Sequence, residues 1–532
     1  MDEYIDHTDD EQSLWSVIGL NIQGHRFGSI DEFLSVKPRW SSLFVRKITT
    51  TNPFADSHTR LLSGLCPRAR PSGSSTASFP ATIVNKHVSY GPWQFDVAVR
   101  HETGLRFYNV YFNHQLMIHE VGLDETVTIY GGETPFMRAL TSLESMFSVG
   151  SLTSELSPGI DCPVDAVFLT VPIIVSPSAG ASTVHNGICI YASAADVHEG
   201  ALRRYVHPHG EDPTQPDPGY ATGTVKKALY VVTQAAIFNY HYAFVNIFSP
   251  SGTYASYVVP SGYIHVDVPH STDHLFGFVS PWLDLRFNIH THRFLFFIDA
   301  LGVNNTVEQT RVYAEGRKSG LDRMSMQVTK VRTEREGQFQ GGDPTTSLAL
   351  CLAGATNAVN SQCLQIINTA PVPSMVSQNS SRSFAWIRRS LWFTKYKENE
   401  LRASSIYNGV DLTDPVVDFA EFSTDEALDE DVVMWVNVGF IHIPGNEDIP
   451  HTPSRTSQLG LILRPQNFFP QTPDGPTNAG YVFTTDCAPP GGNLLAATQH
   501  AIEILLKPLK ELVGSSVYPS GKACEGSWTW LD

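Results

Sequence analysis

The chain has 532 residues, of which 42% are hydrophobic and 11% aromatic, so it can bury a large core and does not belong to the disordered class. Its 53 acidic residues outnumber 36 Lys and Arg, and the resulting net charge of −17 disfavours nucleic acid and anionic membranes as partners. No apolar run approaches the roughly 18 residues that span a bilayer.

The first part of the chain, residues 1–78, is a short segment that ends in a Pro/Ser/Gly-rich linker. Its acidic start lacks the basic and apolar regions of a secretory signal, so we expect a protein of the cytoplasm or another intracellular compartment. Residues 79–486 hold short β-rich runs, such as 228–248, separated by Gly, Pro, Asn and Asp. This pattern predicts a mainly β fold, a large antiparallel β-sandwich.

The tail, residues 487–532, contains apolar residues at helical spacing over 493–514, interrupted by Pro508. We expect an amphipathic helix that docks on its own domain, with binding of a partner or a membrane as the alternative.

Three histidines indicate a metal site. His290 and His292 are separated by one residue in the phrase NIHTHRF, and His442 lies in VGFIHIPGNEDIPHTP. Residues i and i+2 of a β-strand point to the same face, so His290 and His292 can share one metal with a third imidazole from elsewhere. Such nitrogen ligands suit copper or zinc, and copper beside Tyr240 in FNYHY would be placed for oxygen chemistry.

Eight phrases in order make the chain resemble the copper amine oxidases, quinone enzymes whose large β-sandwich catalytic domain dimerises. They are VTIYGGETP, SELSPGIDCP, NYHYAFVNIFSPSG, SGYIHVDV, NIHTH, FTKYKENELRASSIYNGVDLTDPVVDF, DVVMWVNVGFIHIPGNEDIPHTP and LGLILRPQNFFPQTP. Family members usually carry two small α/β domains before the catalytic domain, so the resemblance implies a shortened member.

The resemblance also implies roles for individual residues. A copper ion would be bound by His290, His292 and His442, and Tyr240 would be the precursor of topaquinone. Tyr130 would hydrogen-bond the quinone oxygen, and Asn239 would help to orient the ring. The implied reaction is the oxidation of a primary amine to an aldehyde, with release of ammonia and hydrogen peroxide, by a homodimer.

Four positions depart from the family pattern. Glu144 stands where the family has an aspartate as the base, and Ser142 stands where it has a gate tyrosine. The added methylene of Glu144 moves the carboxylate by about 1 Å, a shift that can cost roughly a hundredfold in rate. Ala236 and His241 replace a threonine and an acid beside Tyr240. We expect His241 to point away from Tyr240, and therefore not to be a fourth copper ligand.

The seven cysteines form no CxxC cluster, which argues against a zinc ribbon or a dense disulfide framework. The resemblance implies a disulfide between Cys162 and Cys189, which closes a loop of about 27 residues and would stabilise by roughly 3 kcal/mol. It also implies calcium ligands at Asp299 and Asp431. A further aspartate of that site is lost, which argues against calcium because this ion requires six to eight oxygens.

Two functions stay open. The first is a copper- and topaquinone-dependent primary amine oxidase, in which we expect Tyr240 to be converted because the metal ligands and the precursor ring are retained. The second is a quinone-free copper protein of the same fold, either an oxygen-dependent tailoring or cyclisation enzyme or a non-catalytic binder. The sequence does not identify the amine.

Overall fold

The computed structural model describes residues 81–470 except for 133, 177–179, 194–201, 208–219, 226, 268–274, 284, 303, 317–322, 354–360, 373–380, 425 and 453–458, and outside that range residues 2–6, 16–22, 25–27, 473 and 480–484. The chain divides into a larger unit, residues 75–202 and 225–475, and a smaller unit formed by residues 1–74, 203–224 and 476–532. None of the described helices is both long and apolar enough to cross a membrane. The helix predicted for 493–514 lies outside the described residues.

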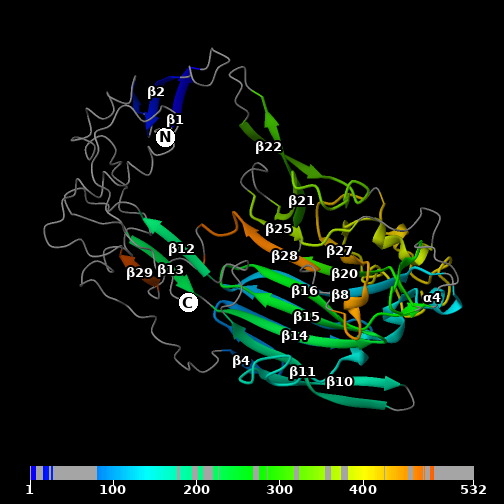
Figure 1. Cartoon of the computed structure of the whole chain (residues 1–532). Coiled ribbons are helices and arrows are strands. Elements are labelled where there is room, and N and C mark those ends of the chain that lie inside the picture. Colours follow the sequence, from blue (N-terminus) through cyan, green and yellow to red (C-terminus); the bar gives the residue numbers. More distant parts are fainter. Residues whose placement is uncertain are drawn as a thin grey trace. The chain divides into compact units, whose positions relative to one another are not determined.

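The larger unit is built from two large antiparallel sheets (Figure 1). In the first sheet, in spatial order, the strands are β23 (Gln338–Phe339), β26 (Leu391–Lys395), β27 (Val432–His442), β20 (His290–Ala300), β8 (Gln115–Tyr130), β7 (Gly104–Phe112), β6 (Trp93–Arg100), β5 (His87–Tyr90) and β4 (Thr82–Val84), with β9 (Ser142–Leu143) beside β8. In the second sheet they are β10 (Val167–Ser176), β11 (Gly180–Ser193), β14 (Ala228–Ile237), β15 (Tyr240–Phe248), β16 (Tyr254–Gly262), β28 (Leu459–Gln466), β25 (Cys363–Asn368), β24 (Thr346–Leu352), β21 (Asn305–Glu315) and β22 (Arg323–Val331).

Smaller elements complete the description. A three-stranded sheet of the larger unit contains β17 (Val266–Asp267), β19 (Arg286–Asn288) and β18 (Gly277–Val279). The helices are short: α4 (Pro135–Ala139) and the 3-10 helices η3 (Glu144–Phe147), η4 (Val149–Leu152), η7 (Arg382–Arg388), η8 (Phe419–Glu421) and η9 (Asn446–Asp448). The smaller unit holds two three-stranded sheets, β1 (Asp2–Asp6), β2 (Ser16–Ile22) and β3 (His25–Phe27), and β12 (Leu202–His207), β13 (Tyr220–Val225) and β29 (Gly480–Thr484).

The core lies between the two large sheets. Side chains alternate along strands such as β6, where every second residue from Trp93 to Val97 is buried. Aromatic rings join the sheets: Phe95 of β6 stacks on Phe248 of β15 with 4.1 Å between ring centroids. The mainly β prediction is therefore confirmed, and the two sheets form a sandwich whose apolar contact stabilises the fold.

Strand β20 is the central support of the candidate site because all of its residues are buried. On one face Phe294 and Phe296 contribute to the sandwich core. On the other face Leu295 and Phe297 pack in a second cluster with Trp435 of β27. A strand covered on both faces is held rigidly, which suits it to position functional side chains.

Candidate active site

Tyr240 begins strand β15, directly after a two-residue turn of Phe238 and Asn239 that follows β14. Ile237 pairs with Tyr240 across this hairpin, and β16 closes on the other side, where Tyr240 pairs with Gly262. A Cβ on Gly262 would lie 2.1 Å from the carbonyl oxygen of Asn239, so only glycine permits this close approach. The result is a buried tyrosine, 1% exposed, at the end of a rigid hairpin.

Two of the predicted metal ligands meet the Tyr240 hydroxyl. His290 begins β20 and pairs directly with His442, which ends β27. Nε2 of His290 lies 3.1 Å from Nδ1 of His442. The hydroxyl oxygen of Tyr240 lies 2.8 Å from the former nitrogen and 3.1 Å from the latter. The structure therefore brings three residues that span 202 positions of the sequence into one contact group.

The opposite nitrogens of these two rings are held by other partners. Nδ1 of His290 lies 3.0 Å from the carbonyl oxygen of Asn288, and Nε2 of His442 lies 3.2 Å from a carboxylate oxygen of Asp448. Burial lowers the pKa of His290 to about 3 and also lowers the pKa of His442, against the opposing effect of Asp448. Neutral imidazoles with one nitrogen fixed leave the other lone pair available for a metal.

His292 is two residues along β20 and is 1% exposed. Its Nδ1 lies 2.6 Å from the hydroxyl oxygen of Tyr242 and 3.3 Å from that of Thr128. Its Nε2 is buried and has no hydrogen-bond partner in the described structure. An unpaired buried nitrogen is costly unless it binds something, so this atom is available to a metal.

The ligand nitrogens of the three histidines nevertheless do not all lie close together. Within the described chain, the group of three side chains whose ligand atoms all lie within 4.8 Å of one another is Glu308, Cys351 and Cys363, not the three histidines. The geometry brings His290 and His442 together, and His292 stands behind the Tyr240 ring, 4.3 Å from it between ring centroids.

Glu144, the predicted base, begins η3 and is 3% exposed. Its Oε1 accepts hydrogen bonds from Thr128 at 2.5 Å and from Tyr242 at 3.3 Å. Its Oε2 is buried without a partner in the part of the chain described. Burial raises the pKa of Glu144 to about 8, with the Glu125 carboxylate adding to the rise and the two hydrogen bonds opposing it. A carboxylate of this kind is a competent base near neutral pH.

Tyr130 and Asn239, the two remaining predicted site residues, contact each other. The side-chain amide of Asn239 donates to the Tyr130 hydroxyl at 3.2 Å and to the carbonyl of Tyr263 at 2.7 Å. The Tyr130 ring stacks on His290 at 4.7 Å. Burial raises the pKa of Tyr130, so this phenol stays protonated and can donate a hydrogen bond.

All of these site residues except His290 and His442 line one cavity of about 180 Å³. Buried polar side chains form its inner wall, among them Glu144, Tyr240, Tyr242 and His292. Ser142, the residue at the predicted gate position, also lines it. The full lining is Thr128, Tyr130, Ala139, Leu140, Ser142, Glu144, Phe147, Ile237, Phe238, Asn239, Tyr240, Tyr242 and His292.

The two substituted positions beside Tyr240 lie away from this cavity. Ala236 and His241 pair with each other across the β14–β15 hairpin, one step from the Ile237–Tyr240 pair. Neighbouring residues of a strand point to opposite faces. His241 is accordingly exposed while Tyr240 is buried, which confirms that His241 is not turned toward the metal ligands.

The predicted calcium residues form a separate polar group. The carboxylate of Asp299 accepts a hydrogen bond from Nδ1 of His119 at 2.9 Å. Burial raises the pKa of Asp299 to about 6, and the nearby Asp431 carboxylate adds to the rise. One oxygen of each aspartate is buried without a partner among the described residues. Two carboxylates are fewer ligands than calcium requires, so the group does not by itself define a calcium site.

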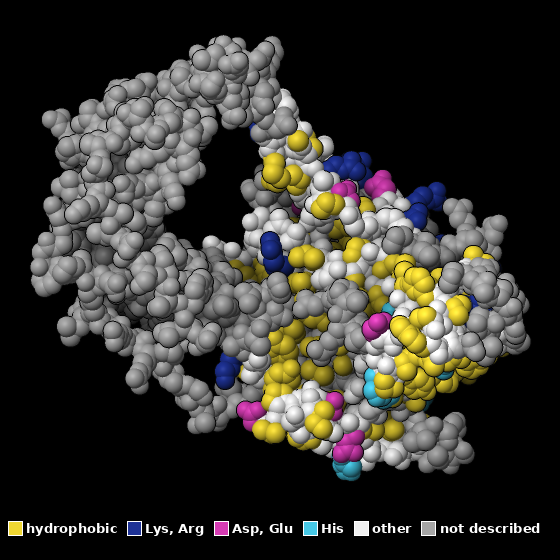
Figure 2. All heavy atoms as spheres, viewed as in Figure 1, with side chains coloured by type: hydrophobic (Ala, Val, Ile, Leu, Met, Phe, Trp, Pro, Cys, Tyr) yellow, Lys and Arg dark blue, Asp and Glu magenta, His cyan; other side chains and the backbone are white. Residues whose placement is uncertain are grey.

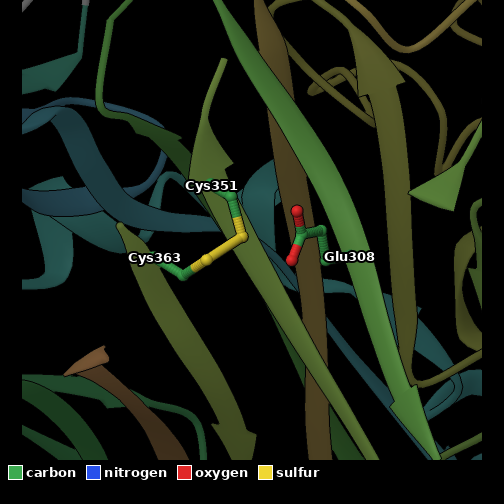
Figure 3. Close-up of side chains that lie close together, drawn as sticks. All are labelled: Glu308, Cys351 and Cys363. Carbon is green, nitrogen blue, oxygen red and sulfur yellow. A yellow bond between two sulfur atoms is a disulfide. The ribbon is translucent and has the colours of Figure 1, made fainter. Parts of the chain in front are cut away.

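Two disulfides occur in the described chain. Cys162 and Cys189 are bonded, as the resemblance implied. Cys351 and Cys363 are also bonded, and they lie opposite each other on β24 and β25 (Figure 3). Glu308 lies beside them and accepts a hydrogen bond from Ser361 at 2.8 Å. With both sulfurs in a disulfide, this group has no thiolate to offer a metal.

Sequence reasoning missed several functional contacts. Tyr242 and Thr128 hold both His292 and Glu144, and Asn288 and Asp448 fix the other two histidines. A usable signal existed for Tyr242, because it stands two residues after Tyr240 and so shares its face of the strand. The other contacts depend on how distant strands pair. The Cys351–Cys363 disulfide was missed for the same reason.

Fold and site together define an antiparallel β-sandwich protein. Its site combines a buried group of histidines and a tyrosine with a carboxylate that lines the adjacent cavity. Residues 82–481 match the family model described as "Copper amine oxidase, enzyme domain", and the chain belongs to the copper amine oxidase family. It is thus a member of a family of copper-containing oxidoreductases.

Relatives and solved structures agree with this assignment. The chain is 30% identical over 405 residues to a copper-containing diamine oxidase of Sus scrofa, covering 74% of this chain and 52% of that protein. The Homo sapiens diamine oxidase is 30% identical over 410 residues, with 73% and 52% covered. The chain spans about half the length of these relatives. The crystal structure of Aspergillus nidulans amine oxidase shares the fold, with a TM-score of 0.67 and 22% identity over 91% of this chain and 65% of that chain.

Proposed function

We propose that the chain is a copper- and topaquinone-dependent primary amine oxidase. The overall reaction converts a primary amine, oxygen and water into an aldehyde, ammonia and hydrogen peroxide. One observation carries the proposal: the buried Tyr240 hydroxyl contacts His290 and His442, and Tyr240 lines the same cavity as the carboxylate of Glu144.

The residues present fit a copper ion. Nε2 of His290, Nε2 of His292 and Nδ1 of His442 would hold it, since the other nitrogen of each ring already has a partner. For His292 this requires the proton on Nδ1, donated to Tyr242, which in turn donates to Glu144. With oxygen, copper would supply the oxidation of Tyr240 to topaquinone, the group that accepts the electrons of the amine.

Glu144 would remove the proton from the carbon next to the amine nitrogen. Its unpaired Oε2 is the atom able to accept that proton, while Oε1 is fixed by Thr128 and Tyr242. The raised pKa of about 8 gives the carboxylate the basicity that proton abstraction needs. The substrate ammonium, held at the same cavity, would supply the counter-charge that this buried carboxylate lacks.

Tyr130 and Asn239 would orient the reacting ring. The hydroxyl of Tyr130 is held by Asn239 at the edge of the cavity, from which it can donate to a ring oxygen. Ala236 and His241 pair on the face away from Tyr240, so these departures from the family pattern leave the contacts of its hydroxyl intact. This argument supports a working quinone over the quinone-free copper protein.

The proposal is tested by loading the full chain with copper in air and measuring amine-dependent release of hydrogen peroxide. Wild type should release peroxide together with an equal amount of aldehyde, and Tyr240→Phe should release neither. Phe retains the ring packing and removes only the hydroxyl, so loss of activity with a retained fold points to the chemistry. Copper-loaded wild type that binds metal but yields no peroxide with any primary amine would favour the quinone-free alternative.

A further inference from the structure

Part of the cavity lining is apolar, in contrast to the buried polar side chains described above. Five of its lining side chains are hydrocarbon: Ala139, Leu140, Phe147, Ile237 and Phe238. Phe238 is 66% exposed and therefore lies where the cavity lining meets solvent, whereas Glu144 and Tyr240 are buried. A molecule whose amine lies at the Glu144 carboxylate can place its remaining atoms against these apolar groups.

Phe238 occupies a position that a phenylalanine rarely takes. It is the first residue of the two-residue turn between β14 and β15, with φ +52°. Tight hairpin turns of this kind prefer Gly or Asn there because a large side chain is unfavourable in the left-handed region. Residues held in such conformations cluster at functional sites, where the surrounding structure tolerates the cost.

The Phe238 ring is part of an aromatic pair. Its centroid lies 4.7 Å from that of Phe147, and the two rings are nearly perpendicular at 86°. Phe147 comes from η3, the helix that begins with Glu144. The pair therefore joins the Tyr240 hairpin to the helix of the base, and its ring edges and faces suit contact with another aromatic ring.

Charge in the cavity favours a substrate with one amine. Among the described residues that line the cavity, the sole carboxylate is Glu144, which the reacting amine would occupy. The second ammonium of a diamine would lie near Phe147 and Phe238 with no opposite charge, and the loss of its hydration would be poorly offset. A cation–π contact with an exposed phenylalanine is too weak to replace a carboxylate.

The size of the cavity admits an aromatic ring. The cavity measures about 180 Å³, and an apolar cavity of roughly 150 Å³ is enough to hold benzene. We propose that the substrate is a primary monoamine with one aromatic ring on a short alkyl chain, and that Phe238, with Phe147, determines this specificity. The inference rests on the proposed amine oxidase function.

The test compares three amines with the copper-loaded full chain: benzylamine, n-butylamine and putrescine, the last two differing only in the second amine. Wild type should have the highest kcat/KM for benzylamine and the lowest for putrescine. Phe238→Asn, which suits the turn and removes the ring, should lower kcat/KM for benzylamine about 3- to 10-fold and change that for n-butylamine less. Phe136→Ala is the control, because Phe136 is exposed but does not line the cavity.

Phe238→Asp adds a carboxylate at the same place and should raise kcat/KM for putrescine about 2- to 5-fold over Phe238→Asn. Equal use of putrescine and benzylamine by wild type, or equal losses for benzylamine and n-butylamine in Phe238→Asn, would overturn the assignment. If no amine yields peroxide, the proposed function fails. In that case the binding of the amines is measured by calorimetry. If benzylamine binds more tightly than putrescine and Phe238→Asn weakens its binding, the assignment of an aromatic monoamine to this cavity is supported. If neither amine is preferred, the assignment is refuted.

Discussion

The hydroxyl oxygen of Tyr240 lies 2.8 Å from Nε2 of His290. This contact joins the first residue of β15 to the first residue of β20, so it links the two sheets of the sandwich at one end. The bond of His290 to the Asn288 carbonyl fixes the ring so that Nε2 faces the tyrosine. A metal held at this nitrogen would therefore lie next to the ring that it is expected to help modify.

The metal assignment predicts that wild type binds about one copper per chain, because three neutral imidazole ligands would leave coordination positions open for oxygen. His442→Ala removes the nitrogen 3.1 Å from that of His290, and copper affinity should fall roughly 10-fold or more. Metal content after dialysis is the measurement. His241→Ala, at an exposed neighbour of Tyr240, is the matched control and should keep its copper. Unchanged copper content in His442→Ala would show that His442 is not a copper ligand.

Much of the fold could be predicted because its cause is local. Alternating burial on strands such as β6 and β15 follows from side chains pointing to opposite faces, which the sequence pattern records directly. The His290 and His292 pair could be found in the same way. The mutual contact of His290 and His442 could not be derived from spacing, because it depends on β20 pairing with β27 in a particular register.

Other parts of the site follow from packing between distant segments. The short helix that carries Glu144 is tied to β8 through Ser145, whose backbone N–H donates to Glu125 at 3.0 Å. Nothing in the sequence near either residue indicates this bond. The exposed ring of Phe238 contradicts the usual preference of a tight turn, so turn chemistry alone predicts a different residue there.

The base assignment predicts that Glu144→Gln retains copper and the modified ring but loses roughly 10²- to 10⁴-fold in kcat, since the amide cannot accept the proton. The pKa of about 8 also sets the pH dependence. Below that pH most of Glu144 is protonated, so kcat/KM of wild type should rise as the pH increases through about 8. Stopped-flow reduction of the enzyme by amine from pH 6 to 9 separates the chemical step from reoxidation. Full turnover by Glu144→Gln would assign the base to another residue.

The buried carboxylate of Glu144 should also lower the free energy of unfolding at high pH, where it is ionised. Its folded pKa of about 8 lies above the ordinary value of about 4.3, so between these values the folded state holds a proton that the unfolded chain releases. Stability from this group is present at low pH and is lost as the pH rises through about 8. Glu144→Gln in metal-free protein should be more stable than wild type at pH 9 by about 1–3 kcal/mol, with a smaller difference at pH 5.

Urea denaturation at the two pH values measures this difference. The control is Glu155→Gln at an exposed position, which should change stability by no more than about 0.5 kcal/mol. A Glu144→Gln variant less stable than wild type at both pH values would contradict the cost assigned to the buried carboxylate.

The chain is expected to form a symmetric homodimer. Hydrophobic side chains gather over part of the described surface (Figure 2), and large apolar residues such as Trp282 and Ile160 are 78% and 85% exposed. Extended apolar surface and the edge strands of a sandwich are commonly covered by a second copy. Light scattering at micromolar concentration should give twice the mass of the chain. A monomer over this range would refute the dimer.

Conversion of Tyr240 is the prediction on which the class of enzyme turns. The hydroxyl contacts of the ring with His290 and His442 are in place, and the substituted positions Ala236 and His241 pair on the opposite face of the hairpin. When metal-free protein is loaded with copper in air, we therefore expect the peptide that carries Tyr240 to gain the mass of added oxygen. When the protein is loaded with zinc instead, the peptide should stay unmodified, because zinc has no redox chemistry. Phenylhydrazine should label the copper-loaded wild type and not Tyr240→Phe, whereas Tyr263→Phe, which changes an exposed neighbouring tyrosine, should be labelled like wild type. An unmodified Tyr240 peptide in protein that holds a full complement of copper would end the amine oxidase proposal and leave a quinone-free copper protein in its place.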